Sequence, residues 1–191
     1  MLKDLVRRNR TYRRFDEADR IPHDVLKDCI ELARLSASAR NAQPLRYVLI
    51  TEEALCGQVF PLLAWAGYLR DWDGPAPGER PSAYIVMLMD KRITENCLCD
   101  DGIAAQSIML GVVEAGYGGC IMASVKRPEL QQLLKLEAHY EIIQVLALGR
   151  PVEIVVLEKI SRGDFKYWRD EKGVHHVPKR SLDELILNLP E

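Results

Sequence analysis

Apolar side chains recur every three or four positions in several parts of the chain, and this spacing predicts amphipathic helices. The clearest case is PHDVLKDCIELARL, in which Leu26, Cys29 and Ala33 share one stripe while charged residues occupy the other side. The segment 101–115 is apolar almost all round, which indicates a helix buried in the core with Gly116 as its C-terminal stop. Further helices are expected over LKDLVRR at 2–8, over 53–68, from Pro128 onward and within PKRSLDELIL near the end.

Short continuous apolar runs predict buried strands. These runs are RYVLIT, AYIVMLM, EIIQVLALGRP and EIVVLEK. Two segments of small, polar, proline or glycine residues are expected to be loops, namely SASARNAQP, which ends at Pro44, and RDWDGPAPGERP at 70–81. Because helices and strands alternate irregularly, the chain is expected to form an α+β domain with helices packed on a mixed sheet.

Composition places the chain among ordinary globular proteins. Its 191 residues suit one domain over 1–191, and hydrophobic and charged fractions of 48% and 28% give no sign of disorder. A net charge of −2 argues against a nucleic-acid partner. Since no apolar run has the length of a membrane helix and the N-terminus lacks a signal-peptide stretch, we expect a cytoplasmic protein that binds no membrane. Five cysteines, an odd number, fit reduced thiols better than a disulfide framework.

The segment RRNRTYRRF holds five arginines in nine residues and stands out against this nearly balanced charge. Two interpretations remain open. The arginines can form a solvated face neutralised by the acidic residues at 16, 17 and 19. Alternatively, they can bind a phosphate group together with Thr11, because guanidinium groups match phosphate oxygens and a hydroxyl adds one more donor.

Four motifs in a fixed order favour the second interpretation. The chain carries RTYRRF, then SASARNAQP, then GYGGC after the buried helix, then ALGRP at the end of a late strand. This set, followed by PKRSLDEL near the C-terminus, resembles the FMN-dependent nitroreductase family over nearly the whole chain. The resemblance implies an α+β fold with a mixed, mainly antiparallel central sheet flanked by helices. It also implies a homodimer that exchanges C-terminal arms, here 163–191.

The resemblance further implies which residues bind FMN. RTYRRF and the basic pair of PKRSLDEL would hold the phosphate, SASARNAQP would approach the flavin from the partner subunit, and the glycines of GYGGC would allow a close backbone approach. The implied residues are Arg10, Thr11, Arg13, Ser36, Ser38, Asn41, Gln43, Gly118, Gly119, Lys179 and Arg180. Two positions depart from the family pattern, since Asn9 stands where an arginine is usual and Leu45 where a tryptophan is frequent.

Several of these residues also have ordinary structural explanations. Asn41 and Gln43 can cap a surface turn, and the glycines can simply end a helix and form a tight turn. Ser181 can begin a helix and leave Arg180 as plain surface charge. Spacing does not choose between Lys179 and Arg180 as the phosphate contact.

Members of this family are expected to take hydride from NAD(P)H and pass electrons to a small-molecule acceptor by a ping-pong mechanism at the dimer interface. The flavin N5 carries the chemistry, so no catalytic side chain and no metal are expected. The loop Arg70–Pro81 is the expected lid of the substrate pocket, with Trp72 and the nearby Tyr68 as its aromatic contacts. An aromatic pocket suits nitroaromatics, quinones or free flavin as acceptors.

Other functions remain open. Within the same family, the chain could be a reductive dehalogenase or a non-catalytic flavin-binding protein. Outside it, the arginines could dock a nucleic-acid backbone. A metal could also be bound by Cys97, Cys99 and Asp100 together with His175 and His176.

Overall fold

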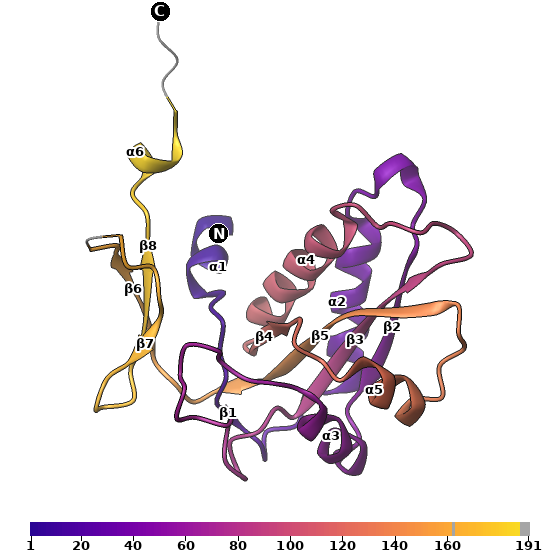
Figure 1. Cartoon of the computed structure of the whole chain (residues 1–191), viewed down its shortest axis with the longest axis horizontal. Coiled ribbons are helices and arrows are strands. Elements are labelled where there is room, and N and C mark those ends of the chain that lie inside the picture. The colour runs from indigo at the N-terminus through magenta and orange to yellow at the C-terminus, as the bar shows by residue number, and fades with distance from the viewer. Residues whose placement is uncertain (162, 188–191) are drawn as a thin grey trace, which may run out of the picture.

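A five-stranded sheet forms the centre of the computed structural model, which describes residues 1–161 and 163–187 (Figure 1). Every strand pair in this sheet is antiparallel. The strand order is β1-β5-β3-β2, with β4 also paired to β5. The strands are β1 (Phe15–Asp16), β2 (Leu45–Ile50), β3 (Ala83–Asp90), β4 (Gly118–Met122) and β5 (Tyr140–Pro151).

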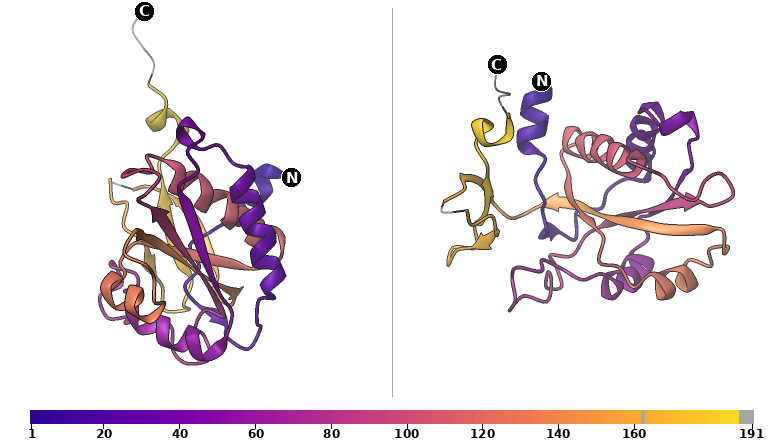
Figure 2. Two further views of the ribbon diagram at one scale, coloured as in Figure 1. Left: turned by 90° about the vertical axis from the view of Figure 1, so that its right-hand side faces the viewer. Right: turned by 45° about the horizontal axis from the view of Figure 1, so that its top comes forward.

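Helices cover both faces of this sheet, as Figure 2 shows. On one face, α2 (His23–Leu35) and α4 (Asp100–Glu114) pack on side chains such as Ile85 and Met87 of β3. On the other face, α3 (Glu53–Val59) and α5 (Arg127–Leu133) pack on the alternate residues of β3, among them Val86. All eight residues of β3 are buried because both of its faces are covered, which explains the continuous apolar run AYIVMLM.

The buried helix α4 lies as the sequence predicts and ends as predicted. Gly116 adopts a φ of +86°, and its N–H donates to the carbonyl of Val113 at 3.1 Å. The N–H of Tyr117 donates to Val112 at 2.9 Å, which completes a Schellman motif. A side chain at Gly111 would bring a Cβ to 2.5 Å from Leu32 of α2, so this glycine lets α2 and α4 approach closely.

A second, smaller sheet lies at one end of the molecule, on the far side of α1 (Leu2–Arg8) from the central sheet (Figure 1). It consists of β6 (Val155–Lys159), β8 (His175–Lys179) and β7 (Trp168–Arg169), in that order. The β6–β8 pair is parallel and the β8–β7 pair antiparallel. The expected α+β architecture with a mainly antiparallel central sheet is confirmed, except that the parallel pairing lies in the smaller sheet and the central sheet is antiparallel throughout.

Two predicted helices differ from those observed. The helix expected over 53–68 ends earlier, with α3 followed by a 3-10 turn at Phe60–Leu62 and an extended Leu63. Pro61 lacks an N–H and so cannot continue the helical hydrogen bonds. The helix expected in PKRSLDELIL is a single turn, α6 (Leu182–Leu185), which buries none of its side chains. It begins with a capping box in which the N–H of Ser181 donates to Glu184 at 2.8 Å. No described helix is long and apolar enough to cross a membrane.

Candidate functional site

The arginine-rich segment leaves α1 and runs along the edge of β4. The N–H of Tyr12 donates to the carbonyl of Gly119 at 2.9 Å, and Thr11 forms an isolated parallel bridge with Gly119. A Cβ on Gly119 would lie 2.5 Å from the Leu148 side chain, and one on Gly118 would lie 2.6 Å from the Tyr12 ring. Both glycines are therefore required by packing, and this packing brings the motifs RTYRRF and GYGGC side by side.

A cavity of about 190 Å³ opens where this segment meets α4 and β8, and we call it the Arg10 cavity. Its walls combine charged and amide side chains with apolar ones. Arg10 and Lys179 supply two positive charges, Thr11 supplies a hydroxyl, and Met109 and Ile121 supply apolar surface. The complete lining is Asn9, Arg10, Thr11, Gln106, Met109, Gly119, Ile121, Val177 and Lys179.

The two cations of the Arg10 cavity are largely free to bind a ligand. Arg10 donates from Nη2 to the Val6 carbonyl at 2.5 Å, but its buried Nε has no hydrogen-bond partner among the described residues. Lys179 forms no ion pair within the part of the chain that the structure describes, whereas its neighbour Arg180 pairs with Glu184 at 3.6 Å. Two unneutralised cations beside a hydroxyl suit an anion such as a phosphate group.

Arg13 lies outside this cavity, in a buried group that we call the Glu153 cluster. The Glu153 carboxylate, whose side chain is 1% exposed, accepts hydrogen bonds from the backbone N–H groups of Arg13 and Arg14 and from Nη2 of Arg169 at 3.0 Å. The guanidinium of Arg13 donates to Nε2 of His175 at 3.2 Å. The cluster thus fastens the C-terminal sheet, including β8 and its Lys179, to the N-terminal segment.

His175 gives the Glu153 cluster a pH dependence. Because Arg13 can only donate, Nε2 of His175 accepts and the imidazole is neutral. Burial, and secondarily the positive charges of Arg13 and Arg169, lower the pKa of His175 from 6.5 to about 4. Between pH 6.5 and about pH 4, His175 is therefore protonated in the unfolded chain but neutral in the folded one. The contribution of His175 to the free energy of unfolding is complete above pH 6.5 and decreases as the pH falls from 6.5 to about 4.

We expect the protonation of His175 to lower the free energy of unfolding by about 3 kcal/mol between pH 6.5 and about pH 4. Urea unfolding measured at half-unit steps from pH 7.5 to 4 would test it. The variant His175→Gln, which keeps an acceptor for Arg13 but does not titrate, should show a flatter profile over the same steps. Equal slopes for the two proteins would contradict the prediction.

The loop SASARNAQP is fastened to the start of α4 by a carboxylate that sequence reasoning did not assign to this role. Asp100, 4% exposed, accepts hydrogen bonds from Oγ of Ser38 at 2.6 Å and from the N–H of Ala39 at 2.8 Å. The hydroxyl of Ser38 in turn accepts from the N–H of Gln43 at 2.9 Å. An aspartate in the first turn of a helix is a signal that could have identified it.

Three residues of this loop adopt left-handed backbone conformations, which are unfavourable for residues other than glycine. Their φ values are +54° for Arg40, +54° for Asn41 and +51° for Gln43. Such conformations persist only where the surroundings impose them, and the Asp100 hydrogen bonds do so here. The loop therefore presents its amide side chains from a constrained backbone.

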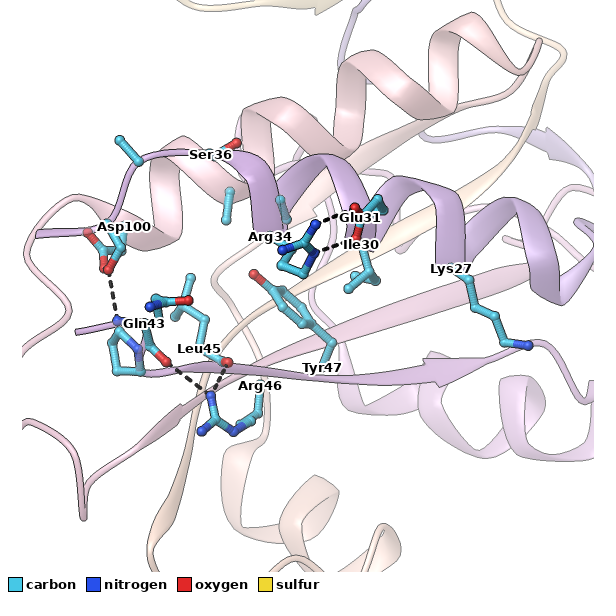
Figure 3. A pocket seen from close by; sticks show the side chains of 15 residues that line it. Lys27, Ile30, Glu31, Arg34, Ser36, Gln43, Leu45, Arg46, Tyr47 and Asp100 are labelled. Atoms are coloured by element: carbon cyan, nitrogen blue, oxygen red, sulfur yellow. Dashed lines mark hydrogen bonds and ion pairs between the residues drawn. The ribbon is translucent and has the colours of Figure 1, made fainter. Parts of the chain in front are cut away.

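A second cavity of about 290 Å³, which we call the Tyr47 cavity, lies between this loop, α2, β2 and the start of α4 (Figure 3). Its walls combine apolar side chains and the phenol of Tyr47 with polar and charged side chains. The ion pair between Arg34 and Glu31, at 2.6 Å, is part of this lining. Burial, together with the nearby charge of Asp100, raises the pKa of Tyr47 to about 12, so the phenol remains a hydrogen-bond donor.

Most of the predicted site residues thus divide between two cavities, while Arg13, Gly118 and Arg180 line neither of them. Arg10, Thr11, Gly119 and Lys179 line the Arg10 cavity, whereas Ser36, Ser38 and Gln43 line the Tyr47 cavity; Asn41 is exposed nearby. Different described residues line the two cavities.

The two aromatic residues expected to contact the substrate lie away from both cavities. Trp72 packs against Trp65, with ring centroids 6.5 Å apart, and under the guanidinium of Arg169 at 4.6 Å. The ring of Tyr68 packs against the ring of Tyr167, with ring centroids 4.9 Å apart. Neither residue lines the Arg10 cavity or the Tyr47 cavity, and the role expected for them in substrate binding stays a prediction.

The residues of the alternative metal site are dispersed. Cys97, Cys99 and Asp100 lie at the start of α4, while His175 and His176 lie on β8. Within 1–161 and 163–187, no three His, Cys, Asp or Glu side chains gather as a set of metal ligands.

Comparisons with known proteins agree with this fold. The nitroreductase family model matches residues 6–150. An iodotyrosine deiodinase from Thermotoga neapolitana is 22% identical over 79% of this chain and 89% of its own length. A nitroreductase-like protein from Streptococcus mutans superposes with a TM-score of 0.70 at 18% identity over the full length of both chains. The NADPH:FMN oxidoreductase of Vibrio harveyi superposes with a TM-score of 0.63 at 18% identity, over 78% of this chain and 68% of that one. The chain belongs to the nitroreductase family.

Proposed function

We propose that this protein binds FMN and uses NAD(P)H to reduce a small-molecule electron acceptor. The observation that carries the proposal is the Arg10 cavity, in which two unneutralised cations and a hydroxyl face a common space beside apolar side chains. Support also comes from the solved oxidoreductase of Vibrio harveyi, which is described as an NADPH:FMN oxidoreductase.

The residues of the Arg10 cavity fit FMN in chemical type. The buried, unpartnered Nε of Arg10 needs an acceptor, and a phosphate oxygen would satisfy it. Lys179 would neutralise a second phosphate charge and Thr11 would donate through its hydroxyl. We favour Lys179 over Arg180 for this contact because Lys179 lines the cavity and Arg180 is paired with Glu184.

The remaining lining residues would bind and orient the rest of the cofactor. The amides of Asn9 and Gln106 offer donors and acceptors for a polyol chain, and Asn9 lies at the cavity in the position where an arginine is usual. Met109 and Ile121 would exclude water from the space beside a ring. The bound FMN would supply the hydride chemistry between NAD(P)H and the acceptor, so no catalytic side chain is required.

We propose that the complete site needs two copies of the chain. The Arg10 cavity, at about 190 Å³, is smaller than the roughly 300–1,000 Å³ of typical cofactor sites, so a second wall is needed. Ser36, Ser38, Asn41 and Gln43 of a second subunit would provide that wall. Many exposed apolar side chains could be buried in such a dimer, among them Leu2, Val6, Ile154, Leu157, Leu182, Leu185, Ile186 and Leu187.

An absorbance spectrum of the purified protein tests the proposal most directly. We expect flavin bands in the protein as isolated or after FMN addition and gel filtration, a dimer in sedimentation, and oxidation of NADH or NADPH when a quinone or nitroaromatic is present. Protein that takes up no FMN would contradict the proposal. Protein that binds FMN but oxidises neither nucleotide would be a non-catalytic flavoprotein.

A second candidate function is reductive dehalogenation, which the similarity to the Thermotoga iodotyrosine deiodinase favours. The same FMN site would serve it, with a halogenated aromatic compound as acceptor. Iodide release from iodotyrosine by reduced protein, compared with turnover of quinones and nitroaromatics, would decide between the two acceptor classes.

A further inference from the structure

A third cavity lies on the α3 side of the central sheet. None of the residues proposed to bind FMN lines it. It has a volume of about 270 Å³, and we call it the Tyr84 cavity. It is enclosed by α3, by the segment that follows β1 and by the residues that lead into β3. Its polar lining comes chiefly from Glu17, Arg20, Glu53, Arg80 and Tyr84, and Phe60 forms an apolar wall.

Two buried donors at this cavity lack partners. Tyr84 is fully buried at 0% exposed, and its hydroxyl makes no hydrogen bond with any described residue. The Nε of Arg80 is likewise buried and unpaired among the described residues, while the Arg80 guanidinium lies 4.3 Å from the centre of the Phe60 ring. Buried polar groups are nearly always satisfied, so these two indicate an occupant of the cavity that can accept hydrogen bonds.

The hydroxyl of Tyr84 remains a donor at any physiological pH. Burial raises the pKa of Tyr84 first, the neighbouring Cys56 and Glu17 raise it further, and the Arg80 charge opposes them. These neighbours also line the cavity, which places the hydroxyl among its polar groups. An acceptor with negative charge would best satisfy Tyr84 and Arg80 together.

The cavity also carries negative charge of its own. Arg20 donates to the carbonyl of Thr51 and to the sulfur of Cys56 at 3.8 Å, both of which are neutral acceptors, so it keeps its positive charge. Glu17 accepts from the N–H of Gly78 at 2.6 Å and, like Glu53, forms no ion pair within the described residues. The lining therefore combines two arginine charges with two carboxylates, and this balance suits a ligand that carries one charge of each sign better than a multiply charged anion such as phosphate.

We propose that the Tyr84 cavity binds a small zwitterion, whose carboxylate accepts hydrogen bonds from Arg80 and Tyr84 and whose ammonium group faces Glu17 and Glu53. An α-amino acid has this pairing of charges and a size that suits the cavity. Phe60, Ala54 and Pro81 provide apolar surface for its side chain. The proposal does not depend on flavin binding, because the residues that line this cavity are separate from those of the Arg10 and Tyr47 cavities.

Calorimetric titration of the purified protein with three matched probes tests the proposal. L-Phenylalanine carries both charges, 3-phenylpropionate only the carboxylate and 2-phenylethylamine only the ammonium group. We expect L-phenylalanine to bind about 10- to 100-fold more tightly than either single-charge probe. No binding by any probe, as expected if water alone fills the cavity, would overturn the proposal, and so would equal binding of 3-phenylpropionate and L-phenylalanine.

Variants assign the binding to this cavity. Tyr84→Phe keeps the ring and removes the hydroxyl, and it should weaken L-phenylalanine binding about tenfold. The matched control Tyr47→Phe removes a phenol hydroxyl at the Tyr47 cavity and should leave this binding unchanged. If Tyr84→Phe does not fold, Arg80→Gln, at a partly exposed position, should give a comparable loss; unchanged binding in a folded variant would overturn the assignment.

Discussion

Replacing Glu153 with alanine is expected to lower the free energy of unfolding by about 3–5 kcal/mol. Its buried carboxylate accepts from two backbone N–H groups, those of Arg13 and Arg14, and from the guanidinium of Arg169. Removal leaves the guanidinium of Arg169, whose side chain is 16% exposed, without its carboxylate partner and both N–H groups without an acceptor, and each loss carries a desolvation cost. Chemical unfolding of the purified variant at pH 7 would measure the change.

A matched control for Glu153→Ala is Glu31→Ala on the exposed side of α2. Glu31 also pairs with an arginine, Arg34, at 2.6 Å, but both side chains are at least half exposed. Exposed pairs contribute at most about 1 kcal/mol, so this variant should stay close to the parent protein. Equal losses for the two variants would show that burial does not strengthen the Glu153 cluster.

The double variant Arg10→Ala and Lys179→Ala is expected to weaken FMN binding by about 10²- to 10⁴-fold. Each cation is proposed to make one charge-assisted hydrogen bond to the phosphate, which contributes about 1.5–3 kcal/mol to the binding free energy. The expected loss in the double variant is the sum of the two contributions. Quenching of flavin fluorescence on titration with protein would give the dissociation constants. Each single variant should lose about half as much FMN binding free energy as the double variant.

Riboflavin, which has the ring and the polyol chain of FMN but no phosphate, is the decisive comparison for this variant. If Arg10 and Lys179 act on the phosphate, the double variant should bind riboflavin about as the parent protein does. Arg180→Ala is the matched control on the protein side, because Arg180 is paired with Glu184 and lies outside the cavity. A large loss of FMN affinity in Arg180→Ala would contradict the choice of Lys179.

Those parts of the fold that depend on local patterns were predictable. The one-sided stripe of α2 and the continuous apolar runs of α4 and β3 follow directly from burial on one face or on all sides. The expected helix over 53–68 was wrong beyond Leu62 because apolar composition continues there while Pro61 interrupts the hydrogen bonds. Composition alone does not distinguish an apolar helix from an apolar extended segment.

The candidate site was predictable only in part, for a different physical reason. The motifs carrying Arg10, Thr11 and Lys179 were visible, and the structure brings these residues to one cavity. Asp100 and Glu153 were not assigned because their partners lie far away along the chain, 62 positions for Ser38 and 140 for Arg13. Such contacts follow no spacing rule, since they arise only when separate elements pack together.

The lining of the Arg10 cavity begins at Asn9 and ends at Lys179, and this span has a consequence for synthesis of the protein. On the ribosome, the arginine-rich segment emerges before β8 and must wait for it, since His175 lies 162 positions after Arg13. Contacts of such high sequence separation form late in folding because loop closure must precede them. The central sheet, whose last strand ends at Pro151, can therefore assemble before β8 has been made, while the cavity closes only after Lys179 has been added.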